Sequence, residues 1–305
     1  TLIFIDSTQG WLVTDDGLQT SAPTAAYVAA TGGTITTVCT NFKVHTFTGP
    51  GTFCVSCAGN ASGSNTVDYL VIAGGGGAAM RAGGGGGAGG YRFSNGTASG
   101  SFCAGPSPLG ASALPVSATS FPITVGGGGA GVPAPAGTSQ NATNGVNSVF
   151  STITSQGGGG SLGHASSAPS CVASTSYGAG GSGAGGSAGN CTNALLARNG
   201  NTPPTTPSQG NNGGVGFNTP PAGIYVGGGG GGAGAVGVDG KGSAPLEGGI
   251  SAGGAGLTST ITGSPVARGG GGGGGTYTNS GSTYAVSSGA GGSGGGGAAG
   301  QYNNP

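Results

Sequence analysis

The chain has 305 residues, of which 80 are Gly and 17 are Pro, and six Lys/Arg balance six Asp/Glu, so its formal net charge is zero. Nucleic-acid binding is built on several phosphate-neutralising cations on one face, whereas the cations here are dispersed one at a time, which excludes a DNA or RNA partner. Disordered chains combine low hydrophobicity with high net charge, but 34% of these residues are hydrophobic, so we expect the chain to collapse or assemble. The dispersed cations are Lys43, Arg81, Arg92, Arg198, Lys241 and Arg268.

Residues 1–73 contain short runs of β-branched and aromatic residues separated by turn residues, which is typical of strands. We expect a β-sandwich-like module here, used for attachment or oligomerisation. The clearest unit is a hairpin in which residues 42–47 and 52–56 flank the turn Gly49-Pro50-Gly51. The other expected strands are residues 2–5, 11–13, 26–29, 34–38 and 67–73.

The amino end, residues 1–6, lacks the basic region of a signal peptide. Because the chain begins with Thr1, we expect that an upstream piece has been removed. No run of 18 apolar residues occurs, so we expect no membrane span.

Residues 74–305 form the second predicted domain, in which a short apolar run repeatedly leads into a run of glycines. Amphipathic helices are nearly absent, and only residues 193–198 could form a turn or two. Collagen is excluded, because its triple helix needs Gly at every third position and these runs lack that period. The structural glycine runs begin at Gly74, Gly83, Gly126, Gly157, Gly227, Gly269 and Gly294.

An ordered glycine run must recover a high backbone entropy cost without any side-chain core. An extended helix of the polyproline II type has three residues per turn and no internal hydrogen bonds. Without Cβ atoms, several such helices can pack side by side and bond to one another. We therefore expect a body of packed polyglycine-II helices, in which a Cβ is accepted only on an outer helix. Flexible Gly/Ser linkers are the alternative.

Six cysteines allow 15 disulfide pairings. An extracellular protein with little core gains stability from disulfides, and we favour Cys171 with Cys191, and Cys39 with one of the strand pair Cys54 and Cys57. Cys54-Val55-Ser56-Cys57 also has zinc-site spacing, but no second close pair completes four ligands. Free buried thiols are the third alternative. The disulfide candidates are Cys39, Cys54, Cys57, Cys103, Cys171 and Cys191.

No catalytic constellation emerges from the sequence, so we expect no enzyme and no cofactor. The pattern Gly-x-Ser-x-Gly occurs at residues 159–163, 185–189 and 291–295, but a nucleophile elbow needs a strand before it and a helix after it. Two His and six acidic residues offer almost no acid–base pair. The phosphate-loop pattern fails, because Lys241 is followed by Gly242 in place of Ser or Thr.

Residues 42–53 and 67–77 resemble the glycine-rich domain of bacteriophage tail-fibre and virion proteins, and the similarity continues through residues 88–92, 121–126 and 147–153. The resemblance implies a polyglycine-II sandwich with variable loops at one end that bind host surface receptors. The six cysteines depart from what such a domain is expected to contain.

From this resemblance we expect a non-enzymatic structural and adhesion protein of the tail-fibre class, located on the virion tail fibre or outside cells. Its expected partners are further copies of itself, as a homo-oligomer or polymer, and a host cell-surface glycan or protein. The alternative is a self-assembling extracellular filament or matrix protein. Isolated aromatic residues are the candidates for receptor contact, although they fit equally well as staples of the glycine helices. They are Tyr177, Phe217, Tyr225, Tyr277 and Tyr284.

Overall fold

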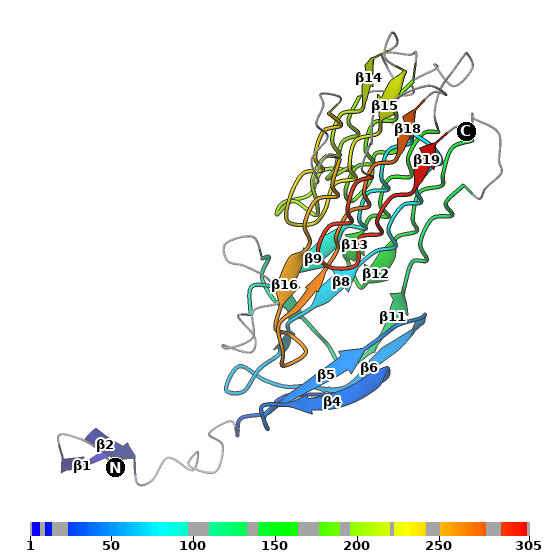
Figure 1. The fold of residues 1–305 in the computed structure, drawn as a ribbon. Coiled ribbons are helices and arrows are strands. Elements are labelled where there is room, and N and C mark those ends of the chain that lie inside the picture. Colours follow the sequence, from blue (N-terminus) through cyan, green and yellow to red (C-terminus); the bar gives the residue numbers. More distant parts are fainter. Residues whose placement is uncertain are drawn as a thin grey trace.

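The computed structural model shows an elongated molecule with β-sheets at one end and a long glycine-rich body extending from them (Figure 1). All regular secondary structure in the described part is β-strand, which agrees with the expected near-absence of helix. The described residues are 2–6, 10–13, 24–96, 110–132, 140–163, 177–189, 196–219, 223–241, 251–278 and 288–303.

A long, bent β-ribbon forms most of the sheet end. Strand β3 (Val28–Thr31) leads into β4 (Thr34–Val38), and β5 (Phe42–Thr46) leads into β6 (Gly51–Ala58). Strand β4 pairs with β5, and β3 pairs with β6, both antiparallel. The chain therefore reverses at residues 39–41.

The expected hairpin around Gly49-Pro50-Gly51 is wrong, because β5 and β6 lie in different sheets. Residues 34–38 are all β-branched, and they give β5 a partner of its own length. The bend opposite residues 47–50 falls at Gly32, where φ is 107° and a Cβ would lie 1.9 Å from the Thr52 carbonyl oxygen. At this corner His45 Nδ1 lies 2.8 Å from the Gly32 carbonyl oxygen.

A five-stranded antiparallel sheet has the strand order β13-β12-β11-β6-β3. Its later members are β11 (Ser120–Thr124), β12 (Ser148–Phe150) and β13 (Ile153–Ser155), which all follow residue 74. The sheet that β3 and β6 begin is thus completed by strands that alternate with glycine runs.

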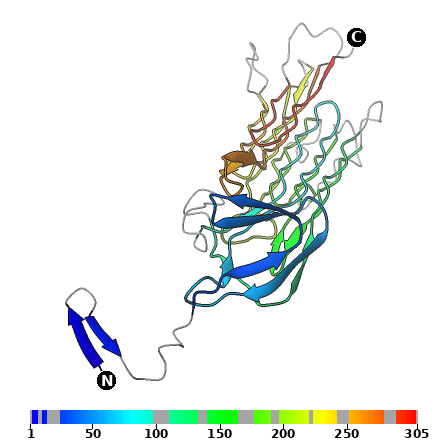
Figure 2. The same cartoon turned by 90° about the horizontal axis from the view of Figure 1, so that it is seen from below.

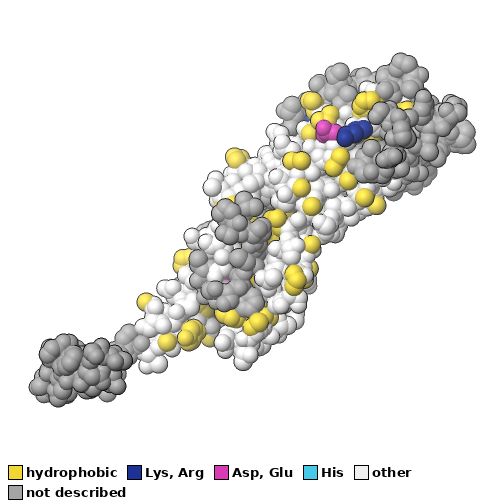
Figure 3. All heavy atoms as spheres, turned by 60° about the vertical axis from the view of Figure 1, so that its left-hand side comes forward, with side chains coloured by type: hydrophobic (Ala, Val, Ile, Leu, Met, Phe, Trp, Pro, Cys, Tyr) yellow, Lys and Arg dark blue, Asp and Glu magenta, His cyan; other side chains and the backbone are white. Residues whose placement is uncertain are grey.

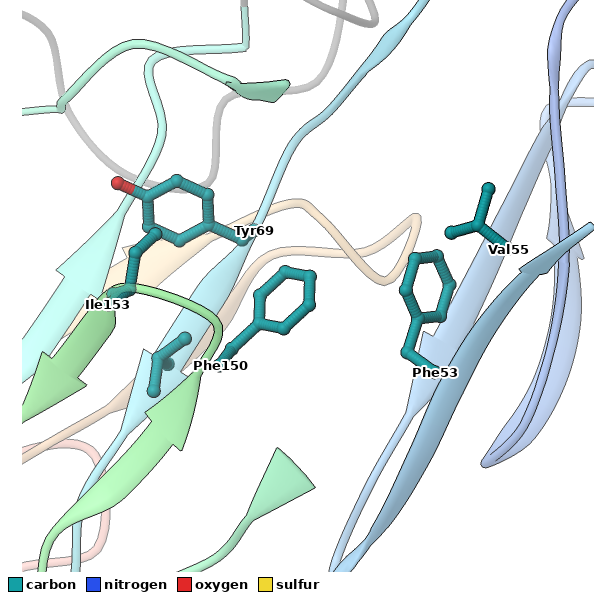
Figure 4. Packing of buried hydrophobic residues seen from close by; sticks show 6 residues of the cluster. Phe53, Val55, Tyr69, Phe150 and Ile153 are labelled. Carbon is teal, nitrogen blue, oxygen red and sulfur yellow. The ribbon is translucent and has the colours of Figure 1, made fainter. Parts of the chain in front are cut away.

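The principal hydrophobic core lies where this sheet meets the glycine-rich body (Figure 4). The Phe53 ring packs edge-on against the Phe150 ring, with 5.8 Å between centroids and an interplanar angle of 90°. Val55 lies two residues from Phe53 on the same face of β6, and both are buried. The remaining buried members are Tyr69, Val71 and Ile153.

The other sheets are small. Strand β18 (Thr276–Thr278) pairs parallel with β19 (Gln301–Asn303), and every other strand pair is antiparallel among the described residues. Strands β14 (Phe217–Thr219) and β15 (Ile224–Val226) complete this four-stranded sheet. The two-stranded sheets besides β4–β5 are β1 (Leu2–Asp6) with β2 (Gly10–Val13), β7 (Thr66–Val67) with β10 (Leu114–Pro115), β8 (Leu70–Ile72) with β9 (Tyr91–Phe93), and β16 (Leu257–Ser259) with β17 (Val266–Arg268).

The glycine-rich body consists of extended segments that run side by side between the sheet end and the four-stranded sheet (Figures 1 and 2). The expected apolar strand before each glycine run is confirmed at five places. Strands β8, β11, β13, β15 and β17 end one or two residues before Gly74, Gly126, Gly157, Gly227 and Gly269. These five glycine runs are therefore each preceded by a short strand.

Candidate functional site: the glycine-rich body and its aromatic residues

Backbone hydrogen bonds between glycine runs repeat every three residues. Successive N–H groups of residues 227–232 donate in turn to three different segments, and the order then starts again. The donor–acceptor pairs are Gly227 to Gly275, Gly228 to Gly186, Gly229 to Val238, Gly230 to Gly272, Gly231 to Gly183 and Gly232 to Ala235, all between 2.8 and 2.9 Å. The direction in which the N–H groups donate therefore repeats every three residues in this segment.

The segment of residues 82–90 bonds to five other segments. Gly85 donates to Gly228 and Ala88 donates to Gly231, so residues 82–90 and 227–232 run parallel to each other. The neighbouring segments 178–189, 269–275, 73–77 and 156–159 all run antiparallel to it, because the bonded residue numbers fall as those of 82–90 rise. A segment surrounded in this way has its backbone groups satisfied by other backbones instead of by water.

The space between segments leaves no room for most side chains. A Cβ on Gly85 would lie 2.0 Å from the Gly272 carbonyl oxygen, and one on Gly230 would lie 2.0 Å from that of Gly86. Buried alanine and serine nevertheless occur at residues 82, 182, 184 and 188, each with no exposed surface. The expectation that a Cβ is accepted only on an outer segment is therefore wrong, since these four side chains are fully buried in the body.

The first glycines of the predicted runs are all constrained, either by a nearby backbone or by their own φ. A Cβ would meet a backbone atom within 2.8 Å at five of them, and the other two have φ of 77° and 93°. The first group is Gly74, Gly83, Gly126, Gly157 and Gly227, and the second is Gly269 and Gly294. Gly294 lies in a turn with Gly295, whose φ is 98°.

Three asparagines at the same three-residue spacing hold one outer segment. The Oδ1 atoms of Asn141, Asn144 and Asn147 accept bonds of 3.1, 2.7 and 2.9 Å. Their donors are the N–H groups of Gly163, Gly160 and Gly157, in that order. We call these three residues the asparagine ladder. The repeat of Asn at 141, 144 and 147 is the sequence signal that could have predicted it.

Tyr225 and Tyr277 lie together on neighbouring strands. Their ring centroids are 5.8 Å apart, and the guanidinium carbon of Arg81 lies 5.4 Å from the Tyr277 centroid. Tyr225 is only 8% exposed and packs against Ala82 and Ala188. Tyr225 is therefore buried between strand β15 and the glycine-rich segments that contain Ala82 and Ala188.

The remaining aromatic candidates are placed separately. Phe217 packs on Ile224 and Val226. The Tyr177 hydroxyl donates to the Ala142 carbonyl oxygen, and burial raises the pKa of Tyr177 above its ordinary value. Tyr284 lies outside the described residues.

The cysteines within the described residues are free thiols. Cys39 and Cys57 are exposed, and Cys54 is half-buried, where Ser120 Oγ lies 3.5 Å from its Sγ. The expected disulfide between Cys39 and Cys54 or Cys57 is therefore not formed in this structure. Cys103, Cys171 and Cys191 lie outside the described residues.

Charged and metal-binding chemistry is sparse on the described surface. Figure 3 shows mostly backbone and uncharged polar atoms, with hydrophobic side chains in small separate groups. Across the described ranges, no group of three or more His, Cys, Asp or Glu side chains could hold a metal ion. Arg198 is 3% exposed, and burial lowers its pKa.

Comparison with known proteins gives one match. The sequence model of a family described as a glycine-rich domain matches residues 46–305. No curated protein and no solved structure matches the chain. In the part of the chain that the structure describes, no helix has the length and apolar character needed to cross a membrane.

Proposed function

Because the chain belongs to the glycine-rich domain family, we propose that it is a non-enzymatic structural and adhesion protein of the phage tail-fibre class, which presents loops to a host cell surface. The observation that carries this proposal is the three-residue repeat of hydrogen bonds between glycine segments. It supports a rigid body whose role is to hold other parts of the chain in place.

The repeat supports a polyglycine-II lattice in particular. A helix with three residues per turn and no internal hydrogen bonds directs successive N–H groups to three sides. Residues 227–232 donate in this way, and residues 82–90 bond to five neighbours. Flexible Gly/Ser linkers would have no reason to place a carbonyl oxygen where a Cβ would otherwise be at most glycines of the body.

The sequence at the far end of the body suits surface contact. Strands β14, β15, β18 and β19 lie at the end away from β4 and β5 (Figure 1). Residues 279–287, which follow β18, contain Tyr284 together with Ser, Thr, Asn and Gly. Tyr, Ser, Gly and Asn are the residues that adaptable recognition loops favour. A host cell-surface glycan or protein is the proposed partner of this end.

Immunogold electron microscopy of the native material tests the proposal, with antibodies raised against the purified chain. Gold particles at the tips of discrete tails or spikes are the expected result. The purified, fluorescently labelled chain should also adsorb to host cells, and an excess of unlabelled chain should prevent it. Absence of tip labelling together with absence of adsorption would overturn the proposal.

The second candidate function is a self-assembling extracellular filament. The observation that favours it is that β3 and β4 each have one edge with no strand partner among the described residues, which another chain could extend. Neutral net charge also removes long-range repulsion between copies. Gold labelling along continuous filaments, with this chain as their subunit, would select this function over the first.

A further inference from the structure

We infer that the β1–β2 hairpin of one copy docks on the free edge of β4 in a second copy, and that the exchange is reciprocal. The two copies then form a closed dimer through their sheet ends. This inference refines the assembly role of the N-terminal module within the proposed function, and it identifies the strands that make the contact.

The hairpin has no further strand partner among the described residues. Strands β1 and β2 pair with each other and with no other described strand, and they lie apart from the body in two views (Figures 1 and 2). Seven of their nine residues are apolar, and residues 2–5 are four apolar residues in succession. Successive residues of a strand occupy opposite faces, so this sequence supplies apolar residues to both faces. An isolated two-stranded hairpin is at best marginally stable in water.

Strand β4 offers an edge of matching character. The β4–β5 sheet has only two strands, and residues Thr34 to Thr37 are all exposed, with Ile35 43% exposed. Soluble proteins protect such edges with Lys, Pro, a bulge or a covering segment. All five residues of β4 are β-branched and uncharged, and none is Pro. Both β1 and β4 are five residues long, so docking would join the two two-stranded sheets into one four-stranded sheet.

Charge favours the same pairing. Residues 1–16 carry Asp6, Asp15 and Asp16 and no Lys or Arg. Lys43 on β5 is exposed and is the only Lys or Arg in the first 80 residues. The acidic hairpin segment of one copy would therefore lie one strand away from the single basic side chain of the sheet that it extends.

The location of the two surfaces makes the assembly closed. Residues 14–27 connect the hairpin to β3 and span at most about 50 Å when fully extended. Hairpin and β4 edge therefore belong to the same end of the molecule. When both surfaces of each copy are used at that end, the contact is the same in both directions, so this contact closes on two copies.

Light scattering coupled to size-exclusion chromatography of the full chain tests this inference. The wild-type chain should have twice the 27.7 kDa mass, and Ile35→Lys should reduce the mass to that of one chain. Val146→Lys is the matched control, since Val146 is 56% exposed and lies outside β4, and it should leave the mass doubled. A monomeric wild-type chain, a doubled mass in Ile35→Lys, or a single mass in the control would overturn the inference.

A mixing experiment identifies the hairpin as the docking segment. Phe4→Lys damages the hairpin and leaves β4 intact, and Ile35→Lys does the reverse. Each variant alone should be monomeric, but an equimolar mixture should form a one-to-one complex, because one hairpin and one β4 edge remain functional. Far-ultraviolet circular dichroism matching that of the wild type establishes that both variants are folded. Two folded variants that fail to associate would contradict reciprocal docking, whatever the outcome of gold labelling or cell adsorption.

Discussion

Single glycines of the body are constrained chiefly by carbonyl oxygens of neighbouring segments. At Gly85 and Gly230 the atom nearest to an added Cβ is a backbone oxygen at 2.0 Å. Such an atom cannot rotate away as the end of a flexible side chain can. A substitution therefore requires one segment to move away from another, and the hydrogen bonds between the two segments weaken as they separate.

Adjacent glycines at 126 and 127 provide a matched comparison. A Cβ on Gly126 would lie 1.9 Å from the Val146 carbonyl oxygen, whereas one on Gly127 has no atom within 4 Å. We predict that Gly126→Ala lowers the free energy of unfolding by about 1–3 kcal/mol through overpacking. Gly127→Ala should raise it by about 0.4–1 kcal/mol, because the unfolded chain loses conformational freedom. Urea denaturation measures both values, and equal effects of the two substitutions would contradict this account.

The burial of Tyr91 predicts how the stability of the folded chain changes at alkaline pH. Its side chain is 1% exposed, and burial raises the pKa of its hydroxyl above the ordinary value near 10, an effect that Ser259 and Arg268 oppose. A raised pKa in the folded state means that the unfolded chain releases its proton first. Stability is therefore complete below about pH 10 and falls as the pH rises through the folded-state pKa.

Thermal denaturation at a series of pH values tests this prediction. The melting temperature of the wild type should decline above about pH 10, and Tyr91→Phe should decline less steeply because it has no proton to release. Tyr27→Phe is the control, since Tyr27 is 67% exposed, and it should follow the wild type. Parallel curves for all three chains would show that Tyr91 does not carry the effect.

At the scale of elements, strands and side-chain ladders fix the glycine segments. Glycine runs alone carry little information about register, because each residue resembles the next. The asparagine ladder aligns residues 141–147 with 157–163 at three successive turns. Strands β12 and β13, which lie between these two segments, pair Val149 with Thr154 and set the same antiparallel register.

Asn144 tests the contribution of the asparagine ladder. Asn144→Ala removes the acceptor of the Gly160 N–H group, and we predict a loss of about 1 kcal/mol in the free energy of unfolding. Asn144→Asp keeps an oxygen acceptor at the same place and should retain most of the stability. Denaturant unfolding of the two variants compares them directly. A loss for Asp as large as that for Ala would mean that the hydrogen bond is not the cause.

The sequence predicted individual strands better than their partners. Alternating β-branched and aromatic residues located β4 at 34–38 and β15 at 224–226 correctly. Pairing was predicted wrongly at Gly49-Pro50-Gly51, because local turn residues favour a hairpin there, while the extended run 34–38 competes successfully for β5. The three-residue pattern of bonds between distant segments was expected from glycine content, but no local signal indicates which segments are neighbours. The prediction that alanines lie only on outer segments was wrong for the same reason, since the space available to a Cβ depends on which segments are its neighbours.

At the scale of the whole molecule, the body joins parts of the chain that are far apart in sequence. Gly86 accepts a bond from Gly272, and Gly87 donates one to Gly159. Removal of one segment therefore leaves unpaired backbone groups on several others. We expect the body to unfold as one cooperative unit instead of segment by segment.

Hydrogen exchange measured by mass spectrometry tests this order against flexible linkers. Amides of residues 227–232 are bonded at every position and should exchange slowly. Residues 294–300 have the same glycine-rich composition, but of their amides only those of Gly296 and Ala299 donate a bond to the backbone. The other amides of this segment should exchange rapidly and serve as the internal control. Rapid exchange in both peptides would contradict the lattice.

In most protein interiors, side chains of particular sizes and shapes fit against one another. A change in one side chain therefore demands a compensating change in its neighbour. The interior between residues 82–90 and 227–232 is built from backbone, with few Cβ atoms. Surface segments that join its ends can therefore diverge in evolution without remodelling what lies beneath them. The body can also grow by whole turns, since three residues added to each of several adjoining segments restore every contact one step further along.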